Sequence, residues 1–334
     1  MNENVALSNR SFSHKSTIPL ATIHLLTYNR FDNIYHNLDS IFAQTYGNIE
    51  IIIADDGSEN FPEKDIRDYI EKKKGNNISN VTILANRVNV GTVKNLNNAI
   101  SNSNGVVYIP LSQDDLFFND SVVELIMHRF NDMPYDVLIT SRYGVNKSGD
   151  FQRFWPHIKA RRVIEKMSQK EMFRAYSESL VKDIASGSVM NISADFLKQF
   201  GMFDERYRLW EDGPFFHKCL RLGYKIDTAY DIVSIKYEQT EGVSNLLNSS
   251  QYMRNDILLF WDTDFQEKKN DFGLFHRRYI AFFNFKRKRK GLLSIIFSIF
   301  LFPDVYVYKF FYSDFIRNWG SEDEKWNLKL SGIL

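Results

Sequence analysis

Short apolar runs alternate with segments of helical periodicity along the first 245 residues of the chain. Between the first two runs, Ile34, Leu38 and Ile41 recur at helical spacing, and Asp32 is the expected N-cap of that helix. Such alternation is typical of a parallel sheet with helices on both faces. It therefore predicts an α/β fold with a mostly parallel central sheet. The apolar runs are residues 20–26, 49–54, 81–84, 106–111 and 137–141.

The composition is that of a folded protein without a strong overall charge. Apolar residues make up 44% of the chain. The 42 Lys and Arg nearly balance the 41 Asp and Glu, so the chain has no overall positive electrostatic field that would hold nucleic acid. The seven histidines show no metal-ligand spacing, and no phosphate-binding glycine motif occurs. Cys219 is the only cysteine, and residues 1–19 contain no apolar signal segment. We therefore expect a cytoplasmic protein.

Polar clusters follow three of the apolar runs, at residues 27–30, 55–58 and 112–115. Parallel sheets bind ligands at the carboxyl ends of their strands. We therefore expect one crevice to gather all three clusters. The pattern predicts neither a helix nor a strand for the basic and aromatic stretch at residues 153–162.

Asp114 and Asp115 form the most informative cluster. Adjacent carboxylates repel each other and gain little from packing, so Mg²⁺ or Mn²⁺ is a natural partner. Such an ion would bridge the oxygens of a diphosphate. The alternative interpretation is a solvated turn, or a cap for the helix expected to begin near Ser121.

Two further acidic pairs also have two interpretations each. Asp55 and Asp56 could form a turn with Gly57, or one of them could accept the N3–H of uracil while the other orders the loop. Asp212 could cap a helix, or it could remove the proton of an acceptor hydroxyl with Glu211 as an auxiliary.

The ordered blocks of residues 18–245 resemble glycosyltransferase family 2, an inverting family of the GT-A fold, and above all its bacterial polysaccharide members. Any one block would be weak, but their common order over more than 200 residues is specific. The blocks are IHLLTYNR (23–30), LDSIFAQTY (38–46), IIIADDGS (51–58), NVG (89–91), SQDD (112–115), FDE (203–205), ED (211–212) and RLGY (221–224).

The resemblance implies a role for each matching residue. Asp212 would be the catalytic base with Glu211 beside it, and Asp115 with Asp114 would hold Mn²⁺ or Mg²⁺. The implied donor is a nucleotide sugar, expected to be a UDP-sugar. The residues implied to bind it are Thr27, Tyr28, Asn29, Arg30, Asp55, Asp56, Gly57, Asn89, Gly91, Lys94 and Asp114.

The implied activity is the transfer of a hexosyl or N-acetylhexosaminyl group to a hydroxyl of a glycan or lipid-linked oligosaccharide, in the synthesis of capsule, O-antigen or a similar surface polysaccharide. Two features depart from the family pattern. Neither Ser112 nor Gln113 is acidic, and residues 237–240 (YEQT) lack the Arg or His that touches diphosphate or metal in many members. These departures favour an alternative, a non-catalytic sugar-nucleotide-binding or scaffold subunit. A nucleotidyltransferase would need a glycine-rich basic loop where residues 27–30 lie.

We expect a flexible segment at residues 1–17, a GT-A domain at 18–245 and a helical extension at 246–334. The extension contains the basic run 286–290 and then the apolar run 292–302, which as a helix would reach only ~16 Å of the ~30 Å bilayer core. One interpretation is peripheral contact with the cytoplasmic face of the inner membrane through residues 286–312, with Tyr306, Tyr308, Lys309 and Tyr312 near the headgroups. The other is packing on the catalytic domain or pairing of two subunits as a homodimer.

Overall fold

The computed structural model describes residues 18–177, 186–224, 226–238, 251–267, 274–289 and 291–307. Expectations for residues 1–17, for Gln239 and Thr240, and for Lys290, Tyr308, Lys309 and Tyr312 lie outside these ranges.

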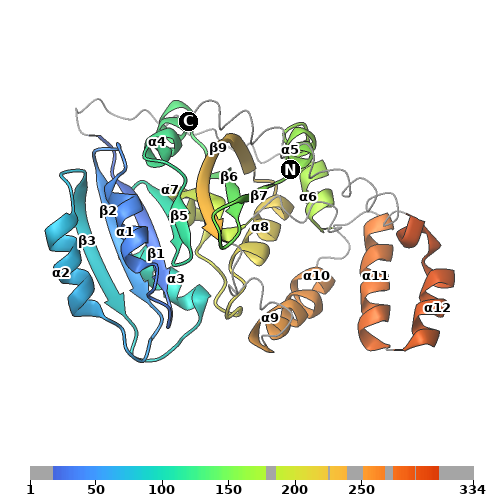
Figure 1. Ribbon diagram of the computed structural model, residues 1–334. Helices are drawn as coiled ribbons and strands as arrows, with labels where there is room; N and C mark the ends of the chain where they lie inside the picture. Colours follow the sequence, from blue (N-terminus) through green and yellow to red (C-terminus); the bar gives the residue numbers. More distant parts are fainter. Residues whose placement is uncertain are drawn as a thin grey trace.

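The described strands form one sheet in the order β3-β2-β1-β4-β8-β6-β9-β5, with β7 paired to β6 (Figure 1). The first four strands are parallel, as is the β6–β9 pair, and the other pairs are antiparallel. The strands are β1 (Ala21–Thr27), β2 (Ile49–Asp55), β3 (Ile78–Ala85), β4 (Val107–Ser112), β5 (Asp115–Phe117), β6 (Val137–Val145), β7 (Phe151–Trp155), β8 (Met190–Ser193) and β9 (Ile226–Glu238).

Helices cover both faces of the parallel strands. Ile51 and Ile53 of β2 belong to the main core, whereas Ile52 and Ala54 point the other way and pack with Ala99 of α3. This double burial confirms the α/β fold that the sequence predicted. The helices of this part are α1 (Ile34–Phe42), α2 (Glu63–Lys73), α3 (Thr92–Ser101), α4 (Val122–Asp132), α5 (Ile158–Ile164), α6 (Gln169–Ser177), α7 (Ala194–Phe200) and α8 (Asp212–Arg221).

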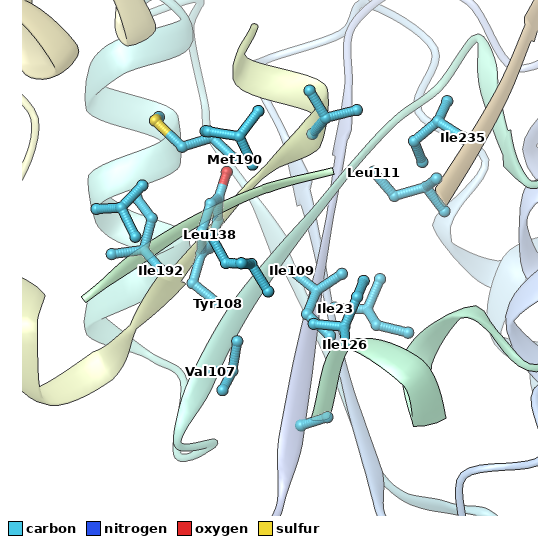
Figure 2. Packing of buried hydrophobic residues seen from close by; sticks show 14 of the residues in the cluster. Ile23, Val107, Tyr108, Ile109, Leu111, Ile126, Leu138, Met190, Ile192 and Ile235 are labelled. Carbon is cyan, nitrogen blue, oxygen red and sulfur yellow. The ribbon is translucent and has the colours of Figure 1, made fainter. Parts of the chain in front are cut away.

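One continuous core joins the two halves of the sheet. Figure 2 shows Ile23 and Ile109 of the parallel half in the same cluster as Leu138, Met190 and Ile235 of the other half. The strands therefore cannot shift relative to one another without opening the core, which fixes the loops at their carboxyl ends.

Four local expectations are corrected or completed by the structure. Asp32 is not the cap of α1, because the helix begins after Asn33 and no side chain caps it. A short strand, β5, begins at Asp115, where the alternative interpretation placed a turn, because it pairs with the distant β9. The strand predicted at 137–141 continues to Val145, and the basic and aromatic stretch 153–162 is divided between β7 and α5.

The extension contains α9 (Gln251–Asp262), α10 (Asp264–Glu267), α11 (Leu274–Lys288) and α12 (Leu292–Leu301). In Figure 1, α9 and α10 lie near the sheet, whereas α11 and α12 form a separate hairpin beyond them. Within the described ranges, no helix has both the length and the apolar character needed to cross a membrane.

His24 makes the stability of the core sensitive to acid. Its side chain lies in the middle of β1, is 1% exposed and packs against the ring of Tyr108 with 4.6 Å between centroids. Burial lowers the pKa of His24 to about 3, although the charge of Glu50 acts in the opposite direction. Below about pH 6.5 the unfolded chain binds a proton that the folded chain excludes, so stability falls as the pH falls from about 6.5 towards 3.

We predict that His24→Leu removes this part of the acid sensitivity. Between pH 7 and pH 5 the wild type should lose about 2 kcal/mol more of its free energy of unfolding than the variant, because one His proton is linked to unfolding. Urea unfolding of both proteins at the two pH values measures the difference. Equal losses in the two proteins would contradict the prediction.

Candidate active site

The loops after β1, β2 and β4 contact one another at the carboxyl edge of the sheet. The Tyr28 N–H donates to Gln113 Oε1 at 2.9 Å, and the Asn29 N–H donates to Ser58 Oγ at 2.8 Å. Arg30 Nη1 lies 3.1 Å from Asp114 Oδ2. The three polar clusters that the sequence placed at strand ends are therefore neighbours in space.

Asp55 orders the turn that follows β2. Its carboxylate accepts hydrogen bonds from the Ser58 N–H at 2.8 Å, from Ser58 Oγ at 2.5 Å and from Thr27 Oγ1 at 3.1 Å. Gly57 has a φ of 75°, and a Cβ there would lie 2.3 Å from the carbonyl carbon of Val88. The turn therefore needs both the carboxylate and the glycine.

Asp56 binds the segment that precedes α3. Its Oδ1 accepts the Val90 N–H and its Oδ2 accepts the Gly91 N–H, each at 2.9 Å, and Asn86 Nδ2 lies 3.3 Å from Oδ1. A carboxylate offers about four acceptor positions, so about one remains for a ligand. Lys94 is exposed in the first turn of α3.

Asp115 is the buried carboxyl of the cluster after β4. It is 6% exposed, and burial raises its pKa to about 7, with Asp114 adding to the rise while Arg142 and Ser112 oppose it. Asn37 of α1 donates to the carbonyls of Ser112, at 3.3 Å, and of Asp115. Sequence reasoning missed Asn37, although a polar residue on the apolar face of α1 is a signal that could have found it.

The two aspartates alone do not enclose a metal ion. Among the described residues, no group of three His, Cys, Asp or Glu side chains could hold one. Mg²⁺ and similar ions are nevertheless often held by one or two carboxylates together with the phosphates of a substrate. Asp114 and Asp115 fit an ion of that kind, since a bound cation would offset the cost of burying the Asp115 carboxylate.

Asp212 lies at the start of α8, beside Glu211. Its Oδ2 accepts the Gly187 N–H at 2.9 Å, and its Oδ1 accepts the Gly213 N–H at 2.7 Å. Glu211 occupies the N-cap position, but its side chain makes no capping hydrogen bond. Burial raises the pKa of both carboxyl groups, and the charge of Asp212 raises that of Glu211 further. A raised pKa makes each carboxylate a stronger base than a solvated one.

Gly187 explains how Glu211 approaches the backbone. A Cβ at residue 187 would lie 2.5 Å from Glu211 Oε1. The glycine therefore leaves room for Glu211 while its N–H orients Asp212. The sequence offered no signal for this role.

Arg142 links the two acidic groups, and sequence reasoning missed it. Its charge lowers the pKa of both Asp115 and Asp212, and its Nη1 donates to Ser188 Oγ at 3.2 Å, next to Gly187. The position of an arginine directly after the apolar run 137–141 was the available signal.

Asp256 of α9 holds the segment that leads into Glu211. It is 4% exposed and accepts the backbone N–H groups of Arg208 at 3.0 Å, Leu209 at 2.7 Å and Trp210 at 3.1 Å. Arg208 in turn donates to the Asn89 carbonyl at 3.0 Å and to the Asn89 side chain. Helix α9 of the extension, the segment before Glu211 and the segment bound by Asp56 therefore form one connected structure.

We predict that Asp256→Ala strongly destabilises the protein. Three partly buried N–H groups would lose their acceptor, and the expected loss in the free energy of unfolding is about 3 kcal/mol. Asp68→Ala, at an exposed ion pair with Lys64, is the control and should leave stability nearly unchanged. Denaturant unfolding of the two variants measures the difference. Equal free energies of unfolding in Asp256→Ala and Asp68→Ala would contradict the prediction.

Comparisons with known proteins agree with this architecture. The chain is similar to an uncharacterized glycosyltransferase of Rickettsia typhi, at 27% identity over 61% of this chain and 59% of that protein, so it spans about three fifths of its relative. It is 30% identical to a Pasteurella multocida hyaluronan synthase over 41% of this chain and 14% of the synthase.

Among solved structures, S. aureus TarS residues 1–349 in complex with UDP-GlcNAc shares the fold, with a TM-score of 0.51, 16% identity and coverage of 78% of each chain. The family model for Glycosyl transferase family 2 matches residues 22–195, more than half of the chain. The chain therefore belongs to glycosyltransferase family 2.

Proposed function

We propose that this protein transfers a sugar, with inversion, from a UDP-sugar to a hydroxyl of a glycan or lipid-linked oligosaccharide. The observation that carries the proposal is the arrangement of Asp212 and Asp115. They lie on segments far apart in the chain, yet the charge of Arg142 lowers the pKa of both. Family membership supports a glycosyltransferase, and the UDP-GlcNAc of the TarS complex supports a UDP-linked hexosyl or N-acetylhexosaminyl donor.

The donor nucleotide would lie against the loops after β1 and β2. The remaining acceptor position of Asp56 would take the uracil N3–H, while Asp55 and Gly57 keep the turn in shape. The Tyr28–Arg30 loop would cover the nucleoside, and Asp114, held by Arg30, would face the ribose or sugar. Asn89, Gly91 and Lys94 would complete the wall.

Asp115 and Asp114 would hold Mn²⁺ or Mg²⁺ together with diphosphate oxygens of the donor. The ion would neutralise charge on the departing nucleotide. Because neither Ser112 nor Gln113 supplies a further carboxylate, the substrate would contribute much of the affinity for the ion.

Asp212 would accept the proton of the acceptor hydroxyl. The N–H groups of Gly187 and Gly213 fix the orientation of its carboxylate, and its raised pKa increases its basicity. The acceptor oxygen would attack the anomeric carbon on the face opposite to the leaving UDP, which inverts the configuration. Glu211, whose pKa is also raised, would be an auxiliary carboxylate beside Asp212.

We predict that Asp212→Asn keeps donor binding and loses transfer. Loss of a general base should lower kcat by roughly 10²-fold or more. Donor binding is measured as the rise in Tm that a UDP-sugar produces with and without Mn²⁺, and transfer as release of UDP with acceptor. Asp195→Asn, an exposed residue of α7, is the matched control. Transfer near the wild-type rate in Asp212→Asn would remove Asp212 from the role of base.

The second candidate is a non-catalytic sugar-nucleotide-binding or scaffold subunit. The altered segment Tyr237–Glu238 and the missing acidic residue before Asp114 favour it. Slow hydrolysis of a UDP-sugar by the wild type in the presence of Mn²⁺ would exclude it, because a subunit that only binds the donor does not cleave it.

We further propose that α11 and α12 contact an anionic membrane surface, which suits a lipid-linked acceptor in surface-polysaccharide synthesis such as that of capsule or O-antigen. Helix α12 turns Ser294 and Ser298 inward, while eight apolar side chains are 43–79% exposed. Residues 274–307 contain seven Lys or Arg and a single Asp, in a chain of net charge +1. An apolar face beside concentrated positive charge is typical of an interfacial anchor at the cytoplasmic leaflet.

We predict that the full-length protein sediments with phosphatidylglycerol vesicles and much less with phosphatidylcholine vesicles. The double variant Phe297→Gln with Phe300→Gln should bind more than about ten-fold more weakly, since two exposed apolar side chains are lost. Leu125→Gln, at an exposed position of α4, is the control that should leave vesicle binding unchanged. A chain that ends before Lys286 is the control that should lose vesicle binding. Unchanged vesicle binding with altered oligomeric state would instead identify α12 as a subunit interface.

A further inference from the structure

A face of the sheet next to the candidate site is built from two arginines and two aromatic residues. Strand β6 lies between β7 and β9, and the registers pair Arg142 with Trp155 and Gly144 with both Arg153 and Tyr237. Residues directly opposite one another on neighbouring strands project from the same face. We call the set Arg142, Arg153, Trp155 and Tyr237 the arginine–aromatic face.

The four side chains hold one another in place. The guanidinium of Arg142 lies 5.4 Å from the ring centroid of Trp155 and 4.9 Å from that of Tyr237. The guanidinium of Arg153 lies 4.4 Å from the Trp155 ring, and its Nε donates to the Tyr237 hydroxyl at 3.4 Å. These distances are within the ~6 Å range of cation–π contacts, so the face is ordered before any ligand arrives.

Gly144 gives the ring of Tyr237 its position. A Cβ at residue 144 would lie 3.0 Å from Tyr237 Cε1 and 3.1 Å from its hydroxyl oxygen. Because glycine has no side chain, the ring can lie across β6 rather than stand away from it. The four side chains of the face remain partly exposed.

The arginine–aromatic face adjoins both acidic groups of the candidate site. Tyr237 pairs with Asp115 in the β5–β9 ladder. Arg142 donates to Ser188, and the preceding Gly187 donates to Asp212. A sugar ring on this face would therefore lie near the carboxylate proposed to activate the acceptor.

The chemistry of the face fits a charged sugar. Rings of Trp and Tyr offer flat apolar surfaces for the C–H groups of a pyranose, and guanidinium groups bind phosphate or carboxylate oxygens. In the described part of the chain, the recorded hydrogen bonds of the two guanidinium groups go to hydroxyl oxygens, at Ser188 and Tyr237. Arg142 also acts on the carboxylates of Asp115 and Asp212, so the charge of Arg153 is the one that remains available to an anion.

We propose that the arginine–aromatic face is an acceptor subsite for a sugar that carries a phosphate or carboxylate group. The inference rests on the proposed glycosyltransferase function and adds to it the charge of the acceptor.

The experiment is a ligand-observed NMR titration of the full-length protein with glucose 6-phosphate, glucuronate and glucose. Saturating UDP and diamagnetic Mg²⁺ are present, so that the donor site is filled. We expect at least one anionic sugar to bind about ten-fold more tightly than glucose, and the stronger of the two identifies the group. Arg153→Gln should abolish this preference, because charged hydrogen bonds of this kind are worth about one factor of ten. Arg153→Lys should retain most of it.

Arg67→Gln, at an exposed ion pair of α2 at the other end of the sheet, is the matched control and should keep the preference (Figure 1). Equal binding of all three sugars, or a preference that survives in Arg153→Gln, would overturn the proposal. So would a preference seen only without UDP, because the arginines would then bind the diphosphate of the donor. Donor hydrolysis by the wild type is measured separately, so failure of the proposed function and failure of this subsite give different results.

Discussion

The parallel pairing of β1 with β2 and with β4 sets the positions of the three polar clusters in the candidate site. Thr27 pairs with Asp55, and Leu26 pairs with Ser112, so three strands end at the same level. Each loop that follows must then lie beside the other two, and the hydrogen bonds between Tyr28 and Gln113 and between Asn29 and Ser58 join them. A slip of one residue in any strand would turn its carboxylate towards the opposite face.

Most carboxylates of the site are occupied in shaping the backbone around it. Asp55, Asp56 and Asp256 accept backbone N–H groups from segments that would otherwise leave buried or partly buried donors without partners. Asp212 also accepts two N–H groups, but it remains partly accessible. Asp115 is as buried as Asp55 and Asp56, but within the described residues the hydrogen bonds that its carboxylate accepts come from the nearby Ser112, and burial raises its pKa. This contrast supports the proposal that Asp115 would hold the ion and that Asp212 would accept the proton.

The extension contributes in two separate ways. Helix α9 is connected to the candidate site, since Asp256 holds the backbone before Glu211 and Asp264 of α10 binds Arg206 and Tyr207. Helices α11 and α12 have their own small core of Tyr279, Phe282 and Val305, and they leave the apolar side of α12 exposed. Helices α9 and α10 therefore contact the segment before Glu211, which lies on the other side of the domain boundary that we expect near residue 245.

The sequence by itself determined the α/β class, the parallel strands and the strand ends that form the candidate site, because apolar periodicity and the polar residues that interrupt it are local properties. It also determined the family, since the order of short motifs survives at low identity. Only the tertiary structure decided the contacts of Arg142, Arg208 and Asp256, the strand β5, and the face shared by Arg153 and Trp155. Each of these depends on segments far apart in the chain, whose pairing is set by packing and by the need to satisfy buried polar groups rather than by any pattern within one segment.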